Sequence, residues 1–208
     1  MKTTTLYLLR HGATAANEQR PYVLQGDQTD GSLSPTGCKQ AAAVAEFLRE
    51  QTIDHIYCSP LKRAMETAQA VAEKHGLPVA QDPRLVEVHV GRWEGLPWMS
   101  IMEQFPQEYH QFMDNPADNP YLDGESYRDV YDRAKPAVDE ILQRHPGECV
   151  LIVAHNVVNR VLLAELLGLE LKQAKSIRQS NTGINVIRDE DGERELMTLN
   201  ACFHLDRV

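Results

Sequence analysis

Arg10 and His11 stand together directly after a short apolar segment, residues 5–9, and Gly12 follows them. An arginine can hold a phosphate group through two parallel hydrogen bonds, and a histidine with an unprotonated ring nitrogen can act as a nucleophile. A neighbouring positive charge favours the neutral imidazole and so keeps that nitrogen available. The pair is therefore compatible with chemistry on a phosphomonoester, which is a dianion at neutral pH, although a lone Arg-His after a strand is usually a surface turn.

Two further basic residues follow apolar segments in the same way. Arg63 comes soon after residues 53–58, and His155 directly follows the wholly apolar run 150–154. Ligands of open α/β sheets bind beyond the carboxyl ends of the strands, so we expect Arg63 and His155 to converge on His11. His155 also stands where a strand meets a helix, and the free N–H groups of a helix N-terminus attract anions.

Four segments in order resemble the motifs of the histidine phosphatase superfamily, the phosphoglycerate-mutase-like fold. One Arg-His-Gly would be weak evidence, but four segments in the expected order and at fitting separations are specific. The resemblance covers residues 5 to about 168 and implies catalysis through a phosphohistidine on His11. The segments are Leu9–Asn17, Cys58–Ala68 with Arg63, Glu87–Gly95 with the acid, and Val153–His155 with the second histidine.

A carboxyl group completes the expected set. Glu87 is expected to protonate the leaving oxygen and then to take a proton from the water that hydrolyses phosphohistidine. Its carboxyl group must therefore carry a proton in the first step. Glu94 is the alternative acid, although the spacing to Gly91 favours Glu87. Asn17 is expected to bind the phosphate, whereas Thr14 is equally well explained by a role in holding the loop.

The chain departs from the family pattern at two places. Asn156 follows the second histidine, where glycine is common in the family, and its side chain would intrude where backbone often approaches the substrate. The loop from Gln25 to Leu33 is slightly longer than usual. We expect this loop to form one wall of the pocket.

Helix signals alternate with the apolar segments. Ser34 and Ser59 each precede a proline, which is the pattern of an N-cap followed by the first helical residue. Strands that alternate with helices predict an α/β fold, a three-layer sandwich with a mostly parallel central sheet and helices on both faces. The expected elements are strands at 5–9, 53–58 and 150–154, helices after Ser34, Ser59 and Ser126 and at 157–167, and two strands within 184–199.

Residues 96–125 interrupt this alternation with four prolines and several aromatic residues. Long insertions in compact domains tend to be functional. We interpret the segment as a cap of short helices inserted into a single domain that spans residues 1–208, and a plain surface excursion is the alternative. The aromatic residues are Trp98, Phe105, Tyr109, Phe112 and Tyr121.

Three functions are compatible with these residues. They are a metal-independent phosphatase for a small phosphomonoester, a cofactor-dependent phosphoglycerate mutase, and a non-catalytic member that binds a phosphorylated ligand or a protein. A mutase must hold both phosphates of a bisphosphate, yet residues 97–125 contain no Lys or Arg. This favours the phosphatase and a less charged leaving group. Every expected catalytic residue type is present, which disfavours the third function, and no step calls for a metal ion or cofactor.

The composition narrows the class of partner. A formal charge of −9 disfavours a nucleic-acid surface, and no apolar run reaches the ~20 residues of a membrane span. Cys38, Cys58, Cys149 and Cys202 form no C-x-x-C pair, and no secretory signal is recognised, so we expect reduced thiols in a cytoplasmic protein. Buried packing is expected for Cys58 and Cys149. The expected partner is a small phosphorylated substrate, and the sequence leaves a homodimer open.

Overall fold

The computed structural model describes residues 2–207, and a six-stranded mixed sheet forms its centre. The strand order is β3-β2-β4-β1-β5-β6. Neighbouring strands from β3 to β1 in this order run parallel, whereas β5 pairs antiparallel with β1 and with β6. The predicted α/β class with a mostly parallel central sheet is therefore confirmed. The strands are β1 (Thr3–Arg10), β2 (His55–Cys58), β3 (Val79–Gln81), β4 (Cys149–Ala154), β5 (Ile184–Glu190) and β6 (Glu193–Ala201).

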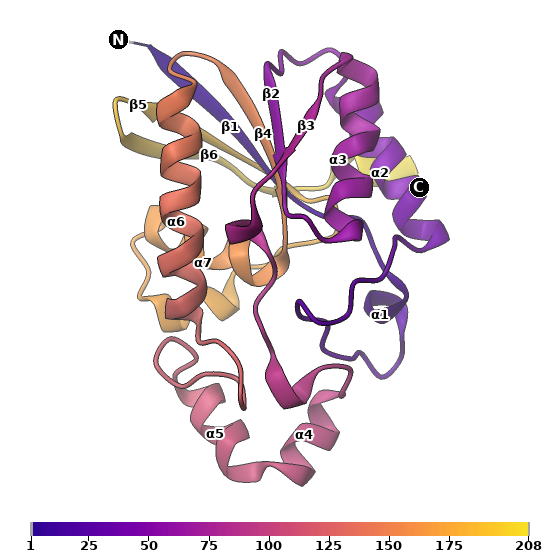
Figure 1. Cartoon of the computed structure of the whole chain (residues 1–208), viewed down its shortest axis with the longest axis vertical. Helices are drawn as coiled ribbons and strands as arrows, with labels where there is room; N and C mark the ends of the chain where they lie inside the picture. Colours follow the sequence, from indigo (N-terminus) through magenta and orange to yellow (C-terminus); the bar gives the residue numbers. More distant parts are fainter. Residues whose placement is uncertain (1, 208) are drawn as a thin grey trace.

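Helices cover both faces of this sheet, as Figure 1 shows. On one face lie α2 (Pro35–Leu48) and α3 (Lys62–His75), which pack against each other and against β2 and β4. On the other face lie α6 (Tyr127–Arg144) and α7 (Asn156–Leu166). The chain thus forms the three layers that the alternation of strands and helices predicts.

The central strand β4 is buried along its whole length. Val150 and Ile152 belong to the hydrophobic cluster beneath α6 and α7, whereas Leu151 and Val153 belong to the cluster beneath α2 and α3. Each of these side chains is fully buried and contributes roughly 1.5–3 kcal/mol of hydrophobic free energy. The strand therefore gives His155, the residue after its last position, a rigid support.

Three helix starts test the capping predictions. Ser34 is the N-cap of α2, where its hydroxyl accepts the Gly37 N–H at 3.0 Å, and Ser126 is the N-cap of α6 in a capping box with Asp129. The prediction for Ser59 is wrong, because α3 begins at Lys62 after the N-cap Leu61. The Ser59 hydroxyl instead accepts the Leu61 N–H at 3.3 Å, in a turn that precedes the helix.

Two short helices, α4 (Trp98–Gln104) and α5 (Pro106–Asp114), form the segment in which short helices are expected. They lie together at one end of the molecule, beyond the carboxyl ends of β1 and β4 (Figure 1). Aromatic packing joins them to the body, because Phe112 and Trp93 are both buried and their ring centroids lie 5.5 Å apart. Within the described residues, no helix is both long and apolar enough to cross a membrane.

Candidate active site

A cavity of about 390 Å³ opens where β1 ends and α7 begins. Four of the six predicted site residues line it, namely His11, Glu87, Arg10 and Asn17. Its wall comes from segments that are far apart in the sequence. The other lining residues are Tyr22, Leu24, Gln25, Val88, Val90, Trp98, Tyr121, Tyr127, Asn156, Val157, Arg160, Arg178, Gln179 and Asn181.

His11 is almost completely buried, with 3% of its surface exposed, and its ring is held in one orientation. The ring nitrogen Nδ1 lies 2.7 Å from the carbonyl oxygen of Gly12, so Nδ1 carries the proton and donates it there. Nε2 then keeps its lone pair. Burial and, secondarily, the charges of Arg10 and Arg63 hold the pKa of His11 well below its ordinary value, the direction expected from the sequence. At neutral pH the Nε2 atom is therefore unprotonated, as a nucleophile has to be.

The loop that carries His11 packs tightly against neighbouring helices. The Gly12 N–H donates to the Thr67 hydroxyl of α3 at 3.0 Å, and the Ser34 N–H donates to the Ala13 carbonyl at 2.9 Å. Gly37 of α2 faces the same loop, and a Cβ atom at this position would lie 1.9 Å from the Ala13 carbonyl oxygen. Only glycine allows this approach, so the start of α2 helps to fix the nucleophile.

Arg10 and Asn17 stand beside His11 in the cavity wall. Arg10 donates from Nη1 to the Gln179 carbonyl at 2.8 Å, and its buried Nε has no protein partner. Asn17 accepts the Thr14 N–H at 3.1 Å and the Asn181 amide at 3.2 Å through Oδ1. Thr14 itself is buried outside the cavity lining and donates to Gln25, which agrees with the loop-holding alternative.

Arg63 and His155 lie behind the cavity wall in this arrangement. Both are fully buried and neither lines the cavity, although the His155 and His11 rings are 5.1 Å apart. The Arg63 guanidinium donates to the carbonyls of Thr29 and Gly26 at 2.9 and 2.8 Å. Among residues 2–207, no partner is found for its Nε or for either ring nitrogen of His155. Buried polar atoms without partners cost roughly 1–3 kcal/mol each, so these atoms mark where a polar ligand would be stabilised.

Charge and burial act together on His155. Its pKa lies well below the ordinary value because of burial first, and then because of the charges of Arg63, His11 and Arg10. The imidazole is therefore neutral at physiological pH. It can serve as a neutral hydrogen-bond donor, while the positive charge of the site comes from the arginines.

The N-terminus of α7, which the sequence predicts to be free for an anion, binds the carboxylate of Glu87. This carboxylate is 4% exposed and accepts the N–H groups of Asn156 at 2.9 Å, Val157 at 3.2 Å and Val88 at 3.0 Å. The first two belong to the start of α7. The expectation that these groups are free for phosphate is therefore wrong: the anion at this helix end is the carboxylate of Glu87.

The alternative acid, Glu94, contacts the main chain at Gly26 instead of lining the cavity. Both of its carboxylate oxygens lie 3.1 Å from the Gly26 N–H, and Glu94 does not line the cavity. Gly26 is also a carbonyl partner of Arg63. Glu94 therefore holds the loop at residues 25–33, and Gln25 is the residue of this loop that reaches the cavity wall.

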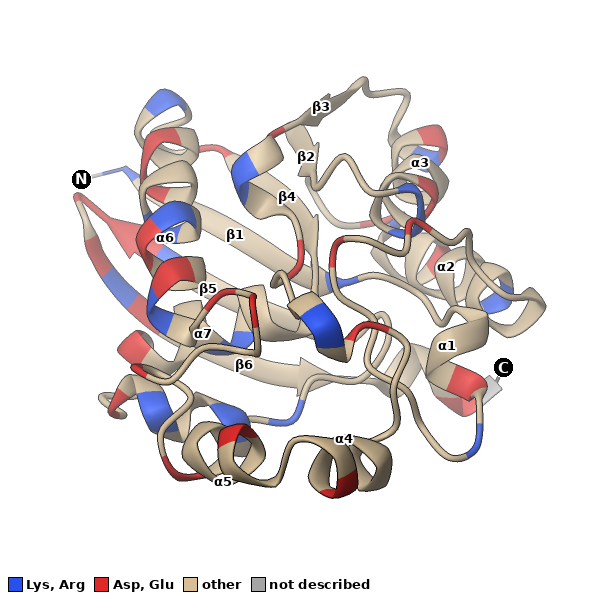
Figure 2. Ribbon diagram, turned by 60° about the horizontal axis from the view of Figure 1, so that its bottom comes forward, with Lys and Arg blue, Asp and Glu red and all other residues tan. Residues whose placement is uncertain are grey.

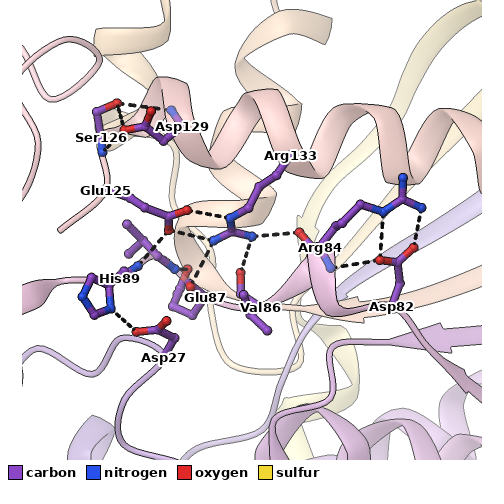
Figure 3. Close-up of polar contacts among 11 residues, drawn as sticks. Asp27, Asp82, Arg84, Val86, Glu87, His89, Glu125, Ser126, Asp129 and Arg133 are labelled. Atoms are coloured by element: carbon purple, nitrogen blue, oxygen red, sulfur yellow. Dashed lines mark hydrogen bonds and ion pairs between the residues drawn. The ribbon is translucent and has the colours of Figure 1, made fainter.

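Arg133 of α6 holds the backbone that carries Glu87, as Figure 3 shows. Its guanidinium donates to the carbonyls of Arg84 and Val86 at 2.8 Å each and to that of Glu87 at 3.1 Å. It also pairs with both carboxylate oxygens of Glu125 at 2.8 and 2.9 Å. A planar fork with five donors suits this set of acceptors. Sequence reasoning missed Arg133, because three of its five acceptors are main-chain oxygens far away in the sequence.

The cavity contains cations that the sequence argument did not count. Arg160 of α7 and Arg178 both line it, and neither forms an ion pair with a carboxylate among the described residues. The absence of basic residues from α4 and α5 is visible in Figure 2. The inference of a less charged leaving group rested on that absence. It is not supported, because Arg160 and Arg178, which lie outside α4 and α5, bring positive charge into the cavity.

The aromatic residues divide into two groups. Of the five singled out by the sequence, only Trp98 and Tyr121 line the cavity, whereas Phe112 is buried against Trp93 and Tyr121. Tyr127 is an unforeseen lining residue. Burial raises the pKa of both Tyr121 and Tyr127, so their hydroxyls stay protonated and neutral.

The cysteines take no part in the site. All four are free, Cys58 and Cys149 are buried as predicted, and none lines the cavity. Burial raises the pKa of each of these two thiols to about 12. Thiolates are the nucleophilic form, so neither residue is a reactive group at neutral pH.

Comparison with known proteins places this geometry in a family. The model of the histidine phosphatase superfamily, branch 1, matches residues 6–202. The chain belongs to the histidine phosphatase superfamily. Phosphoserine phosphatase 1 of Hydrogenobacter thermophilus is 34% identical over 200 residues, which cover 96% of this chain and 93% of that protein. Phosphoglycerate mutase-like protein 4 of Arabidopsis thaliana is 38% identical and covers 91% of this chain and 81% of its own length.

A solved structure has nearly the same fold. Phosphoserine phosphatase of Entamoeba histolytica, as a histidine-to-alanine mutant in complex with phosphoserine, has a TM-score of 0.87. It is 27% identical and covers 97% of this chain and 99% of its own. The same enzyme has also been solved with 3-phosphoglyceric acid. The predicted family and the predicted class, a phosphoric monoester hydrolase, are confirmed.

Proposed function

We propose that this histidine phosphatase hydrolyses a small phosphomonoester whose leaving group carries a carboxylate, without a metal ion and through a phosphohistidine on His11. One observation carries the proposal. The Nε2 lone pair of His11 faces a cavity in which Arg10, Arg160 and Arg178 have no carboxylate partner among the described residues. Such a wall has more positive charge than one phosphate group needs.

The first chemical step forms a bond between Nε2 of His11 and phosphorus, and the bond from phosphorus to the leaving oxygen breaks. Arg10, Arg63, Asn17 and His155 would stabilise the equatorial phosphate oxygens. The first two and His155 have buried nitrogen atoms without a partner among the described residues, and Asn17 lines the cavity. For Arg63 and His155, this requires the phosphate to reach the wall in front of them.

The proton for the leaving oxygen comes from Glu87. Three main-chain N–H groups hold its carboxylate in the cavity wall, and the proton arrives with the substrate. A phosphate dianion beside a carboxylate favours protonation of one of the two groups, because like charges repel. In the second step water attacks phosphorus, Glu87 takes the proton of that water, and inorganic phosphate leaves His11 unmodified.

The leaving group would lie against Arg160, Arg178 and Asn156. Arginine binds carboxylates through two parallel hydrogen bonds. The Oδ1 atom of Asn156 is buried and has no partner, so it can accept a hydrogen bond from an ammonium group. A carboxylate and an ammonium on one small alcohol describe a phosphorylated hydroxy-amino acid, and phosphoserine is the simplest example. The helices α4 and α5 would form the cap over this part of the cavity.

Three matched substrates test this assignment in the presence of a chelator. Phosphoserine has both groups, 3-phosphoglycerate lacks the ammonium, and phosphoethanolamine lacks the carboxylate. Replacing Arg160 with Met should raise KM for phosphoserine at least about tenfold and leave phosphoethanolamine unaffected, since a charged hydrogen bond contributes about 1.5–3 kcal/mol. Asn156→Gly should reduce the preference for phosphoserine over 3-phosphoglycerate. Equal effects of Arg160→Met on all three substrates would contradict the proposed carboxylate contact.

The same assay separates the other two functions. A mutase would isomerise 3-phosphoglycerate once primed with bisphosphoglycerate and would release little phosphate. A non-catalytic member would bind phosphoserine without turnover in the wild type. We expect phosphate release without a primer, and we expect His11→Ala to abolish it.

The four free thiols support a reducing, cytoplasmic location for the protein. Fractionation of the cells that make it, with detection by antibody, tests this. Recovery from an oxidising compartment would contradict it.

A further inference from the structure

A second cluster of chemically active side chains lies at the amino ends of β2 and β4, at the end of the sheet opposite the cavity. His55 begins β2, Glu148 directly precedes β4, and His145 is the C-cap of α6. One ligand atom from each of the three residues lies within 4.8 Å of the others. Glu148 and His155 flank the two ends of β4, so this cluster is about 20 Å from the catalytic histidines.

One carboxylate oxygen is the centre of this cluster. Oε2 of Glu148 lies 2.8 Å from Nε2 of His55 and 3.1 Å from Nδ1 of His145. The two imidazole rings are stacked, with centroids 3.6 Å apart and planes inclined by 23°. Two histidine nitrogens and a carboxylate oxygen that converge in this way are a ligand set typical of zinc, with a fourth position left open for water.

A hydrogen bond on the far side of the His145 ring also fits a zinc ligand. Nε2 of His145 lies 2.8 Å from the Tyr57 hydroxyl. If Nδ1 binds a metal ion, Nε2 carries the ring proton and donates it to the Tyr57 oxygen. Histidine ligands of metal ions almost always have such an outer partner, which fixes the tautomer and the ring orientation. His145 is also only 13% exposed, so its ring has little freedom to turn away.

The backbone around the cluster is held independently of the three side chains. The Thr4 hydroxyl donates to the His145 carbonyl at 3.3 Å and accepts the Gly147 N–H at 2.9 Å. His55 is paired with Val150 in the register of β2 and β4. The ligands therefore come from a strand and a fixed turn rather than from a mobile loop.

We propose that His55, His145 and Glu148 form a binding site for a divalent transition-metal ion such as Zn²⁺, separate from the catalytic cavity. Around a tetrahedral zinc ion the ligand atoms are about 3.3 Å apart, given bond lengths of about 2.0–2.2 Å. The two nitrogen–oxygen distances of 2.8 and 3.1 Å need to open slightly. The stacked rings, whose planes are inclined by 23°, must also rotate so that both lone pairs point at the ion. The bound ion would join β2, the turn before β4 and the end of α6.

The test is a titration of the chelator-treated, dialysed enzyme with Zn²⁺, followed by calorimetry, with Co²⁺ absorption as a second readout. The wild type should bind one ion at this site and gain thermal stability. His145→Gln and Glu148→Gln should each weaken that binding at least tenfold, and Tyr57→Phe should weaken it about tenfold through the lost outer hydrogen bond.

Two control variants show whether a loss of Zn²⁺ binding is specific to the proposed ligands. His110→Asn removes an exposed histidine elsewhere, and His11→Ala removes the other close pair of histidines. Both should retain the ion. Unchanged Zn²⁺ affinity in His145→Gln and Glu148→Gln, or loss of binding in His11→Ala alone, would overturn the proposal, and so would the absence of binding in the wild type. Phosphatase activity should be the same with and without the ion, so failure of this site leaves the proposed function untouched.

Discussion

Arg133 offers the sharpest test of how the fold positions the acid. We consider Arg133→Met, which keeps an apolar stem in place of the side chain and removes all five of its hydrogen bonds to Arg84, Val86, Glu87 and Glu125. Breaking one partner of a buried ion pair costs about 3–5 kcal/mol. Because the Arg133 and Glu125 side chains are 20% and 24% exposed, water can replace part of the loss. We expect the free energy of unfolding to fall by about 2–4 kcal/mol.

The effect on catalysis should appear in kcat rather than in KM. Arg133 does not line the cavity, but it holds the carbonyl of Glu87 itself. A displacement of a catalytic group by about 1 Å can cost roughly a hundredfold in rate. We therefore expect a fall in kcat for phosphoserine of roughly 10- to 100-fold, with KM little changed.

Two further variants make this result interpretable. Arg133→Lys should not restore kcat. A single ammonium group cannot reach the three main-chain carbonyls and the Glu125 carboxylate at the same time, as the planar guanidinium does. Arg128→Met removes an exposed arginine on the same helix, which pairs with Asp118 at 2.6 Å, and it should change neither stability nor kcat appreciably. Urea unfolding and steady-state kinetics measure both quantities. A destabilised Arg133→Met enzyme with wild-type kcat would refute the idea that Arg133 positions Glu87.

Three other perturbations have defined outcomes. His11 and His155 have pKa values well below those of the unfolded chain, so the stability they contribute is complete above about pH 6.5 and is lost as the pH falls below it. Urea unfolding should show the free energy of unfolding falling by up to about 1.4 kcal/mol per pH unit for each histidine. The dependence on pH should be weaker in His155→Gln, and an equal dependence in both proteins would contradict this prediction. Gly37→Ala should lower stability by about 1–3 kcal/mol and reduce kcat, because its Cβ would meet the loop of His11; wild-type values of both would contradict the close packing. Iodoacetamide at neutral pH should label Cys38 and leave Cys58 unmodified without loss of activity, as mass spectrometry can show; inactivation upon labelling would contradict the assigned roles.

The layers of the fold could be predicted because they depend on local patterns, and four of the six proposed site residues line the cavity. The wholly apolar run 150–154 predicts a strand buried on both faces, and β4 is such a strand. Ser34 and Ser126 predict helix starts through hydrogen bonds that span three residues. Strand β3 was not predicted, because its three residues, Val79–Gln81, lie at the sheet edge and are mostly exposed.

The remaining features depend on contacts that a linear pattern does not contain. Arg160 and Arg178 belong to the cavity because α7 and the segment after it turn toward β1, and neither residue lies in one of the recognised motifs. Ser59 failed as a cap because Pro60 continues a turn instead of starting the helix. The N–H groups at the start of α7 bind Glu87 because a distant segment, which Arg133 holds, places that carboxylate there.

The most direct test of the account is to trap the intermediate. Rapid mixing of the chelator-treated enzyme with phosphoserine, followed by a denaturing quench at alkaline pH, preserves phosphohistidine for peptide mapping. We expect one acid-labile phosphoryl group on His11 in the wild type. His11→Ala should carry no such group and should release no phosphate. A phosphorylated residue other than His11, or turnover that survives in His11→Ala, would contradict it.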